Sequence, residues 1–222
     1  MLRVLIAFVF AWPSVTLAGF VPVEPLGVED ALPEKFALDG TTLIYDTDQA
    51  KDQAQREIEG QDVDAFLAVL STHSAVKTLQ LNSIGGEVWA GNEIARIVID
   101  FELDTVVAGE CSSSCVPIFL AGNVRQMTRG SKIGFHQSNW SADGLKKYYD
   151  KWRDDENWET AFDFASWLFK DTQSEVFKEL TYMISRGVDA EFAIQTKQMR
   201  SSMWFPSRRI LQQAGVLRSD TR

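Results

Sequence analysis

Apolar and polar residues recur along this chain with two different periods, and the places where the period changes predict the order of strands and helices. Residues 36–46 alternate as a strand pair that turns at Asp39-Gly40. The apolar residues of 63–70 recur at helical spacing, whereas residues 76–81 alternate again. The first part of the pattern therefore predicts a hairpin, a helix and a further strand.

Two strand–turn–helix units follow one another in the middle of the chain. The strand at 76–81 ends at a glycine turn, and residues 88–98 after that turn have helical spacing. Residues 105–108 predict a β-branched strand that ends at Gly109, and 112–121 a largely apolar helix that must be buried. Because two such units place helices across parallel strands, the pattern predicts an α/β fold.

Beyond these units the pattern predicts one short strand and three helices. The strand, 132–135, presents His136 at its end. The stretch from 137 to 157 is polar and aromatic, and no element is assigned to it. The helices are a long one that begins at Trp158 and stops at Gly187, and two short ones at 190–199 and 207–213.

The first residues add a targeting signal to this picture. Arg3 is followed by an apolar run from 4 to 12 and by small residues at 16–18, which is typical of a secretory signal cleaved after Ala18. The run is shorter than the roughly 20 residues that a bilayer-spanning helix needs, so we expect no stable membrane anchor after cleavage. The expected organisation is a signal peptide at 1–18, an N-terminal arm at 19–34 and one α/β domain at 35–222, in a periplasmic or secreted protein.

Charge and composition exclude some classes of binding partner. The net charge is −9 over 222 residues, and nucleic acids or anionic membranes would need clustered Lys and Arg instead. Nothing in the sequence resembles a phosphate-binding loop, and exported compartments generally lack ATP. We therefore expect no nucleotide cofactor and no nucleic-acid partner.

The chain contains two cysteines, Cys111 and Cys115. In an exported protein an even pair is more often a disulfide than two free thiols. On a helix the spacing of four would place both on one face with Cα atoms about 6 Å apart, within reach of a disulfide. A zinc site ranks far below, because two thiols and two histidines, one of them the distant His73, do not make a closed tetrahedral site.

The segment between the cysteines, Ser112-Ser-Ser114, carries candidate chemistry. A serine becomes a nucleophile only when a base takes its proton, and His136 is the plausible base, since His73 follows a helix where a cap or surface role is ordinary. Backbone amides of Gly86 and Ser114 are candidates to stabilise charge on a substrate carbonyl oxygen. Each feature alone is typical of an ordinary cap or tight turn. Their ordered combination favours acyl transfer.

At these residues the chain resembles the proteolytic subunit of the Clp protease and its exported relatives, within the Clp/crotonase superfamily. The resemblance covers roughly residues 79–137. The segments that carry it are Asn82-Ser-Ile-Gly-Gly86, where the family has proline in place of isoleucine, the following Ala90-Gly91, the bracketing glycines Gly109 and Gly122, and His136-Gln137.

The resemblance implies a residue-level site. Ser113, rather than Ser112 or Ser114, would be the nucleophile and His136 the base, with the amides of Gly86 and Ser114 forming the oxyanion hole. It also implies the superfamily's repeated β-β-α spiral and a peptide or protein substrate. The aromatic segment after His136 lies where the family carries its ring-forming handle, which makes the chain a candidate homo-oligomer by analogy.

Two departures from the family pattern matter. Where the family has its triad aspartate, residues 201–206 contain no carboxylate. The site is then a Ser-His dyad, or another group such as Ser201, Ser202 or Asp189 orients the imidazole, or catalysis has been lost. The cysteine bracket is absent from the cytosolic protease, and a disulfide there would either rigidify the turn of the nucleophile or only stabilise the fold.

Two hypotheses lead. The first is an exported, ATP-independent serine hydrolase, most simply a peptidase, that needs no metal or cofactor. The second is a catalytically inactive Clp-like fold that serves as an envelope binding or scaffolding protein. A crotonase-type acyl-CoA enzyme is disfavoured by export, a Ser-Lys hydrolase by the histidine, and a cysteine nucleophile by an oxidising compartment.

Overall fold

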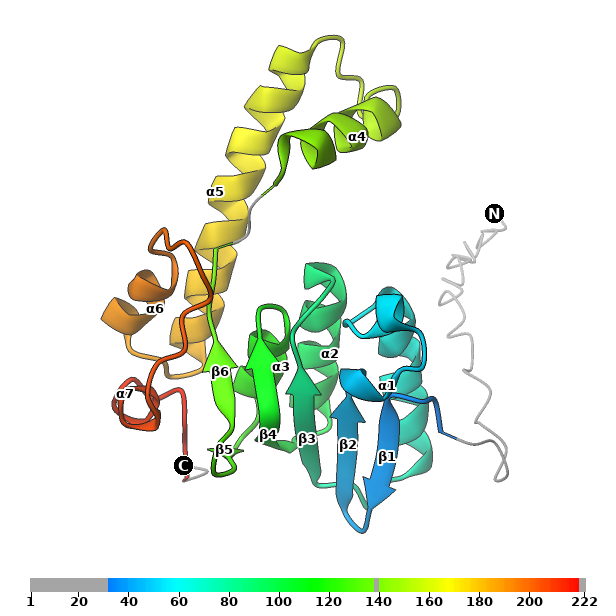
Figure 1. Ribbon diagram of the computed structural model, residues 1–222, viewed down its shortest axis with the longest axis vertical. Coiled ribbons are helices and arrows are strands. Elements are labelled where there is room, and N and C mark those ends of the chain that lie inside the picture. The colour runs from blue at the N-terminus through cyan, green and yellow to red at the C-terminus, as the bar shows by residue number, and fades with distance from the viewer. Residues whose placement is uncertain (1–31, 138–139, 220–222) are drawn as a thin grey trace, which may run out of the picture.

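The computed structural model describes residues 32–137 and 140–219 (Figure 1). The predicted signal peptide, 1–18, lies outside the described residues, as does the predicted N-terminal arm up to residue 31. In the ranges that are described, no helix is both long enough and apolar enough to cross a membrane.

Strands and helices alternate along most of the chain. The strands are β1 (Phe36–Asp39), β2 (Thr42–Asp46), β3 (Thr78–Ser83), β4 (Asp104–Ser112), β5 (Arg125–Met127) and β6 (Lys132–Gly134). The helices are α1 (Gly60–Thr72), α2 (Val88–Asp100), α3 (Cys115–Ala121), α4 (Ala142–Trp152), α5 (Ala161–Ser185), α6 (Ala190–Thr196) and α7 (Arg208–Gln213), with short 3₁₀ turns at Thr47–Gln49 and Gln53–Gln55.

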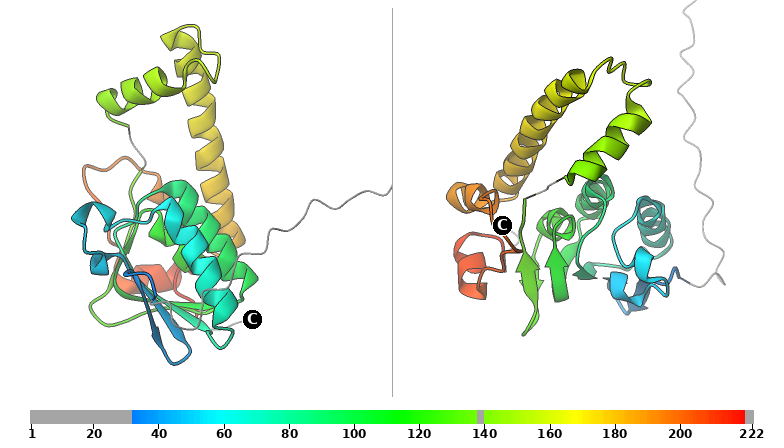
Figure 2. Two further views of the ribbon diagram at one scale, coloured as in Figure 1. Left: turned by 90° about the vertical axis from the view of Figure 1, so that its right-hand side faces the viewer. Right: turned by 45° about the horizontal axis from the view of Figure 1, so that its top comes forward.

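Within the described residues the strands form one mixed, six-stranded sheet. β1 and β2 make the predicted antiparallel hairpin, and β2, β3, β4 and β5 then follow side by side in parallel. β6 also pairs with β4 in parallel, beyond the end of β5. Helices α1, α2 and α3 lie next to one another on one face of the sheet (Figure 2). The α/β fold predicted from the pattern is confirmed.

The boundary between β4 and α3 differs from the prediction. A strand was expected at 105–108 and a helix at 112–121, but β4 continues to Ser112 and α3 begins at Cys115. Gly109 has φ +125°, so the strand does not end there but bulges. The prediction was wrong because a glycine within a strand was taken as the end of that strand.

The bulge changes which residues face each other. Leu81 of β3 pairs with Val107 of β4, yet Ser83, two residues further on, pairs with Cys111. β4 therefore contains two residues more than β3 over the same length. Its second half then pairs with β6, which extends the sheet beside the serine segment.

A helical arm projects from this body (Figures 1 and 2). Its long helix, α5, begins at a capping box in which Thr160 and Asp163 bond each other's backbone amides, and Gly187 with φ +82° follows its end. The predicted start at Trp158 was too early because Thr160 is the cap. At the inner end of α5 the Tyr182 hydroxyl donates to the Pro117 carbonyl at 2.8 Å.

Two elements were not predicted. β5 has only three residues, too few for an alternating pattern, and α4 lies in the polar and aromatic stretch. Ser141 caps α4 by accepting a hydrogen bond from the Gly144 amide. Aromatic rings hold α4 against the outer part of α5, with Tyr148 of α4 stacked 5.9 Å from Trp167 of α5. The ring cluster is Trp140, Tyr148, Tyr149, Trp152, Trp158, Phe164 and Trp167.

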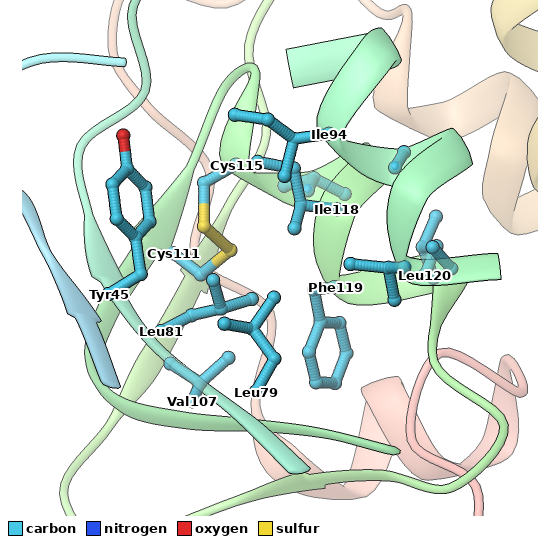
Figure 3. Close-up of a cluster of buried hydrophobic side chains, with 14 of the residues drawn as sticks. Tyr45, Leu79, Leu81, Ile94, Val107, Cys111, Cys115, Ile118, Phe119 and Leu120 are labelled. Carbon is cyan, nitrogen blue, oxygen red and sulfur yellow. A yellow bond between two sulfur atoms is a disulfide. The ribbon is translucent and has the colours of Figure 1, made fainter. Parts of the chain in front are cut away.

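The core lies between the sheet and its three covering helices. Figure 3 shows Leu79, Leu81 and Val107 of the sheet close to Ile118 and Phe119 of α3. These side chains are fully buried, and burial of each such side chain contributes about 1.5–3 kcal/mol. The core thus fixes α3, the helix that follows the serine segment.

Candidate active site

Ser113 occupies the turn between β4 and α3 in a left-handed conformation, with φ +56°. This conformation costs a non-glycine residue about 1–2 kcal/mol, so surrounding contacts must hold it. The Ser113 amide donates to the Gly134 carbonyl of β6 at 3.2 Å, and the Ser113 carbonyl accepts from the Val116 amide at 3.0 Å. Ser113 therefore lies in a sharp strand-to-helix turn, after the last residue of the strand.

The side chains of Ser113 and His136 converge. Nε2 of His136 lies 2.7 Å from Oγ of Ser113, and Nδ1 lies 2.8 Å from the backbone carbonyl oxygen of Gln137. A carbonyl oxygen only accepts, so this contact assigns the ring proton to Nδ1 and leaves Nε2 free to accept from the serine hydroxyl. This tautomer is the one that a general base needs.

Among the residues that the structure describes, no side-chain carboxylate takes the place of the Gln137 carbonyl. Asp189 caps α6, where its carboxylate accepts from the Phe192 amide at 2.9 Å. Ser201 and Ser202 are exposed, and neither bonds the His136 ring within the described part of the chain. Every residue has a backbone carbonyl, so no residue type in the sequence indicates this contact, and only the structure identifies it.

The glycine turn after β3 lies against the serine turn. Gly85 has φ +106°, and a Cβ placed on it would lie 2.7 Å from the Cβ of Ser113 and 3.1 Å from the amide nitrogen of Ser114. Any side chain at this position would push the two turns apart. The amides of Gly86 and Ser114 have no hydrogen-bond acceptor among residues 32–137 and 140–219.

A disulfide joins Cys111 to Cys115, with Cα atoms 5.3 Å apart. The two residues do not share a helical face, contrary to the expectation, because Cys111 belongs to β4 and Cys115 is the first residue of α3. Both are fully buried, and Figure 3 shows the sulfur atoms within the apolar cluster. The bond thus joins the end of β4 to the start of α3 and closes the turn that contains Ser113 on its buried side.

The serine next to the nucleophile candidate has a separate role. Ser112 Oγ donates to Glu110 at 2.6 Å, and Lys132 makes an ion pair with the same carboxylate at 2.7 Å. Burial alone would raise the pKa of the Glu110 carboxyl, but the hydrogen bonds from Lys132 and Ser112 outweigh it and lower the pKa. Ser112 is therefore engaged away from the imidazole.

A cavity of about 450 Å³ opens beside the two side chains. Ser113, Ser114 and His136 line it, whereas Gly86 lies outside its lining. Its apolar wall comes from α2, α3 and α5 and includes Val88, Ala95, Ile99, Val116, Leu120 and Met183.

The lysines and glutamates that line the cavity are paired with one another, and Arg96 of the lining pairs with Glu93 outside it. Lys197 is paired with Glu179 and Lys178 with Glu175, and burial lowers the pKa of the Lys197 ammonium. Among the described residues, no three or more His, Cys, Asp or Glu side chains gather so that they could hold a metal ion. The cavity therefore offers apolar contacts beside a hydroxyl and an imidazole.

The fold is similar to that of solved ClpP1 structures. ClpP1 from Listeria monocytogenes is similar to this chain with a TM-score of 0.51 and 19% sequence identity, over 72% of this chain and 84% of that chain. A mutant of the same ClpP1 gives a TM-score of 0.51 and 17% identity over the same shares. No protein-family model matches the sequence, and no curated protein matches it either.

At this level of identity the likeness shows the fold. The Clp-like fold that the motifs between residues 79 and 137 suggested thus extends over most of the chain.

Proposed function

We propose that this protein is an exported, ATP-independent serine hydrolase, most simply a peptidase. Ser113 is the nucleophile and His136 the general base, and the amides of Gly86 and Ser114 bind the oxyanion. The observation that carries the proposal is the 2.7 Å contact between His136 Nε2 and Ser113 Oγ beside an apolar cavity. A Clp-like fold supports the peptidase class.

The reaction follows from the tautomer. Ser113 Oγ attacks the substrate carbonyl carbon while its proton passes to Nε2 of His136, and the carbonyl electron pair moves onto the oxygen facing the two amides. Collapse of this intermediate expels the leaving amine, which takes the proton back from Nε2. Water then attacks the acyl carbon while it gives a proton to the same nitrogen, and Nε2 returns that proton to Ser113 Oγ as the bond from the serine oxygen to the acyl carbon breaks and the acid is released.

The Gln137 carbonyl replaces part of what a triad carboxylate does. It keeps the proton on Nδ1, so the imidazole has the correct tautomer, but it carries no full negative charge to stabilise the imidazolium. Loss of the correct tautomer costs about 10⁴ in rate in a triad enzyme. Because the tautomer is retained here, we expect a slow enzyme rather than an inactive one.

The cavity and the disulfide support the finer parts of the proposal. Apolar walls with internally paired charges fit a substrate with an apolar side chain next to the scissile bond. A buried disulfide is typical of an oxidising compartment, which agrees with a signal peptide at 1–18. We further propose that the protein self-associates through its arm.

The test is covalent labelling of the mature protein with a fluorophosphonate probe. Wild type should be labelled at one residue, and both Ser113→Ala and His136→Ala should abolish labelling, with His73→Ala as the matched control that keeps it. Labelling of Ser113→Ala at the wild-type rate would overturn the nucleophile. The measurement is intact-protein mass spectrometry against time.

The inactive binding protein remains the second candidate. It is favoured by one observation, that His136 meets a carbonyl and no carboxylate. It predicts a folded wild type that the probe does not label at all.

A further inference from the structure

A buried ionic cluster lies at the start of α1, on the side of the fold away from His136. It consists of Lys35, Tyr45, Glu59 and Asp62. Lys35 Nζ donates to Glu59 Oε2 at 2.9 Å and to Asp62 Oδ2 at 3.0 Å, and the Tyr45 hydroxyl donates to the same Asp62 oxygen at 2.6 Å. Tyr45, Asp62 and Lys35 are 0%, 4% and 6% exposed. Burial, and then the Asp62 carboxylate, raises the pKa of the Tyr45 hydroxyl, which therefore stays a neutral donor.

The cluster holds the short segment from 57 to 59. Lys35 Nζ donates to the Glu57 carbonyl at 2.8 Å, and Asp62 Oδ2 accepts from the Glu59 amide at 2.9 Å. Residue 58, between these two anchors, is fully buried. The ionic groups thus fix the backbone of Ile58 from both sides.

Ile58 in turn pairs with the glycine turn. Its amide donates to the Gly85 carbonyl and its carbonyl accepts from the Glu87 amide, both at 2.8 Å. A Cβ placed on Gly86 would lie only 2.3 Å from the Ile58 carbonyl oxygen, so the two backbones are in direct contact. Gly85 lies against Ser113 on its other side.

Each link between the cluster and the serine turn is therefore a direct contact. We propose that this ionic cluster positions the Gly85–Gly86 turn, so that the Gly86 amide faces the oxyanion. These residues touch no substrate and act through Ile58 as positioning residues. The inference rests on the proposed hydrolase function, because it assigns a purpose to the oxyanion hole of that reaction.

The burial of the cluster explains why it is suited to this role. A buried ion pair contributes little net stability, but it fixes one arrangement, because a shifted partner would leave a charge unpaired in the core. The Gly86 amide must stay aligned with an oxygen that carries negative charge only in the transition state. A rigid anchor behind a flexible diglycine provides that alignment.

The first experiment compares fluorophosphonate labelling of Lys35→Met and Tyr45→Phe with that of Val69→Ala. Val69 is fully buried in α1 and its side chain makes none of the hydrogen bonds of the cluster or of Ile58, so its truncation destabilises the same region while those hydrogen bonds keep their donors and acceptors. The maximal labelling rate should fall about tenfold in the cluster variants, less than the 10²–10³ lost with an oxyanion donor. The probe concentration at half-maximal rate should not change, and Val69→Ala should label like wild type.

The second experiment measures hydrogen exchange of the Ile58 and Glu87 amides in the same variants. Both amides should exchange faster in Tyr45→Phe than in wild type, and their exchange rates should be lower in Val69→Ala than in Tyr45→Phe. Tyr45→Phe removes only a hydroxyl, which keeps the test decisive should Lys35→Met fail to fold.

The outcomes separate the two proposals. Wild type that labels at Ser113, with cluster variants whose labelling and exchange match Val69→Ala, overturns the positioning role and leaves the hydrolase intact. Wild type that does not label overturns the hydrolase. In that case faster exchange in Tyr45→Phe still supports the mechanical link, and unchanged exchange overturns it as well.

Discussion

At the scale of single residues, the left-handed conformation of Ser113 lowers the stability of the fold. With φ +56°, a glycine at this position would relieve about 1 kcal/mol of backbone strain relative to alanine. We therefore expect Ser113→Gly to be more stable than Ser113→Ala by about that amount, while both lose labelling. Chemical denaturation measures the difference.

A control for this prediction lies on α5. Ser174 is exposed in the middle of the helix, where glycine is about 1 kcal/mol less stable than alanine. The order of the two variants should therefore reverse between positions 113 and 174. The same order at both positions would show that the serine turn is not strained.

The contact between Ser113 and His136 could be expected from the sequence, but the acceptor for the other imidazole nitrogen, Nδ1, could not. A hydroxyl-rich turn after one strand and a histidine after a neighbouring strand meet when the strands are parallel, as β4 and β6 are. The acceptor for Nδ1 is a backbone carbonyl, which every residue has, so no residue type indicates it. The ionic cluster at the start of α1 was also missed, because its members are far apart in sequence and only the fold brings them together.

At the scale of elements, Arg125 joins the ends of three helices. Its guanidinium donates to the carbonyls of Leu120 at 3.1 Å, Arg186 at 2.9 Å and Gly215 at 2.7 Å, just after or within the last turns of α3, α5 and α7. Helix C-termini attract cations. Burial, and then the neighbouring Arg186 and Arg218, lowers its pKa to about 10, so it is still charged at neutral pH.

Replacing Arg125 should be costly. Arg125→Leu removes the donor to the carbonyls of Arg186 and Gly215, whereas the Leu120 carbonyl still accepts from the Arg186 side chain, and we expect it to lower the free energy of unfolding by about 3 kcal/mol or more. Arg125→Lys should not restore stability, because an ammonium cannot reproduce the planar guanidinium contacts. Arg208→Met is the control, since Arg208 also bonds carbonyls but is exposed. Equal losses for Arg125→Leu and Arg208→Met in urea titrations would contradict this account.

The element boundaries that could be predicted are those with local signals. Asp39-Gly40 of the hairpin and Ser207 at the start of α7 follow turn and cap rules that involve only neighbours. The end of β4 depends instead on pairing with β6, a contact made across twenty-two residues from Glu110 to Lys132. Pairing over that distance overrides the local meaning of Gly109.

At the scale of the whole molecule, the arm was the least predictable part. The aromatic residues of α4 and α5 are interleaved with charges, so their sequence periodicity is weak. They stabilise the arm by packing on each other rather than on the body, as Trp158, Phe164 and Trp167 do. Only the position of the two helices relative to each other reveals which face of α5 is covered.

The other face of α5 is uncovered and apolar. Phe162, Phe169, Phe177 and Ile184 are 85%, 68%, 69% and 46% exposed, and their spacing of seven or eight places them in one stripe. A continuous exposed stripe of this kind is typical of an interface. We therefore expect two copies of the chain to associate through α5.

The double variant Phe169→Asp/Phe177→Asp should shift the protein from oligomer to monomer, because four buried aspartates across a two-fold interface would cost more than the apolar contact contributes. Size-exclusion chromatography with light scattering at micromolar protein measures the mass. Ser174→Asp adds one aspartate per chain at an exposed position of α5 outside the stripe, and it should leave the mass unchanged. A monomeric wild type, or a double variant that keeps the wild-type mass, would contradict an interface on this face.

Since α5 also lines the cavity through Met183, monomerisation should further slow labelling at Ser113 if the arm needs its partner to stay in place.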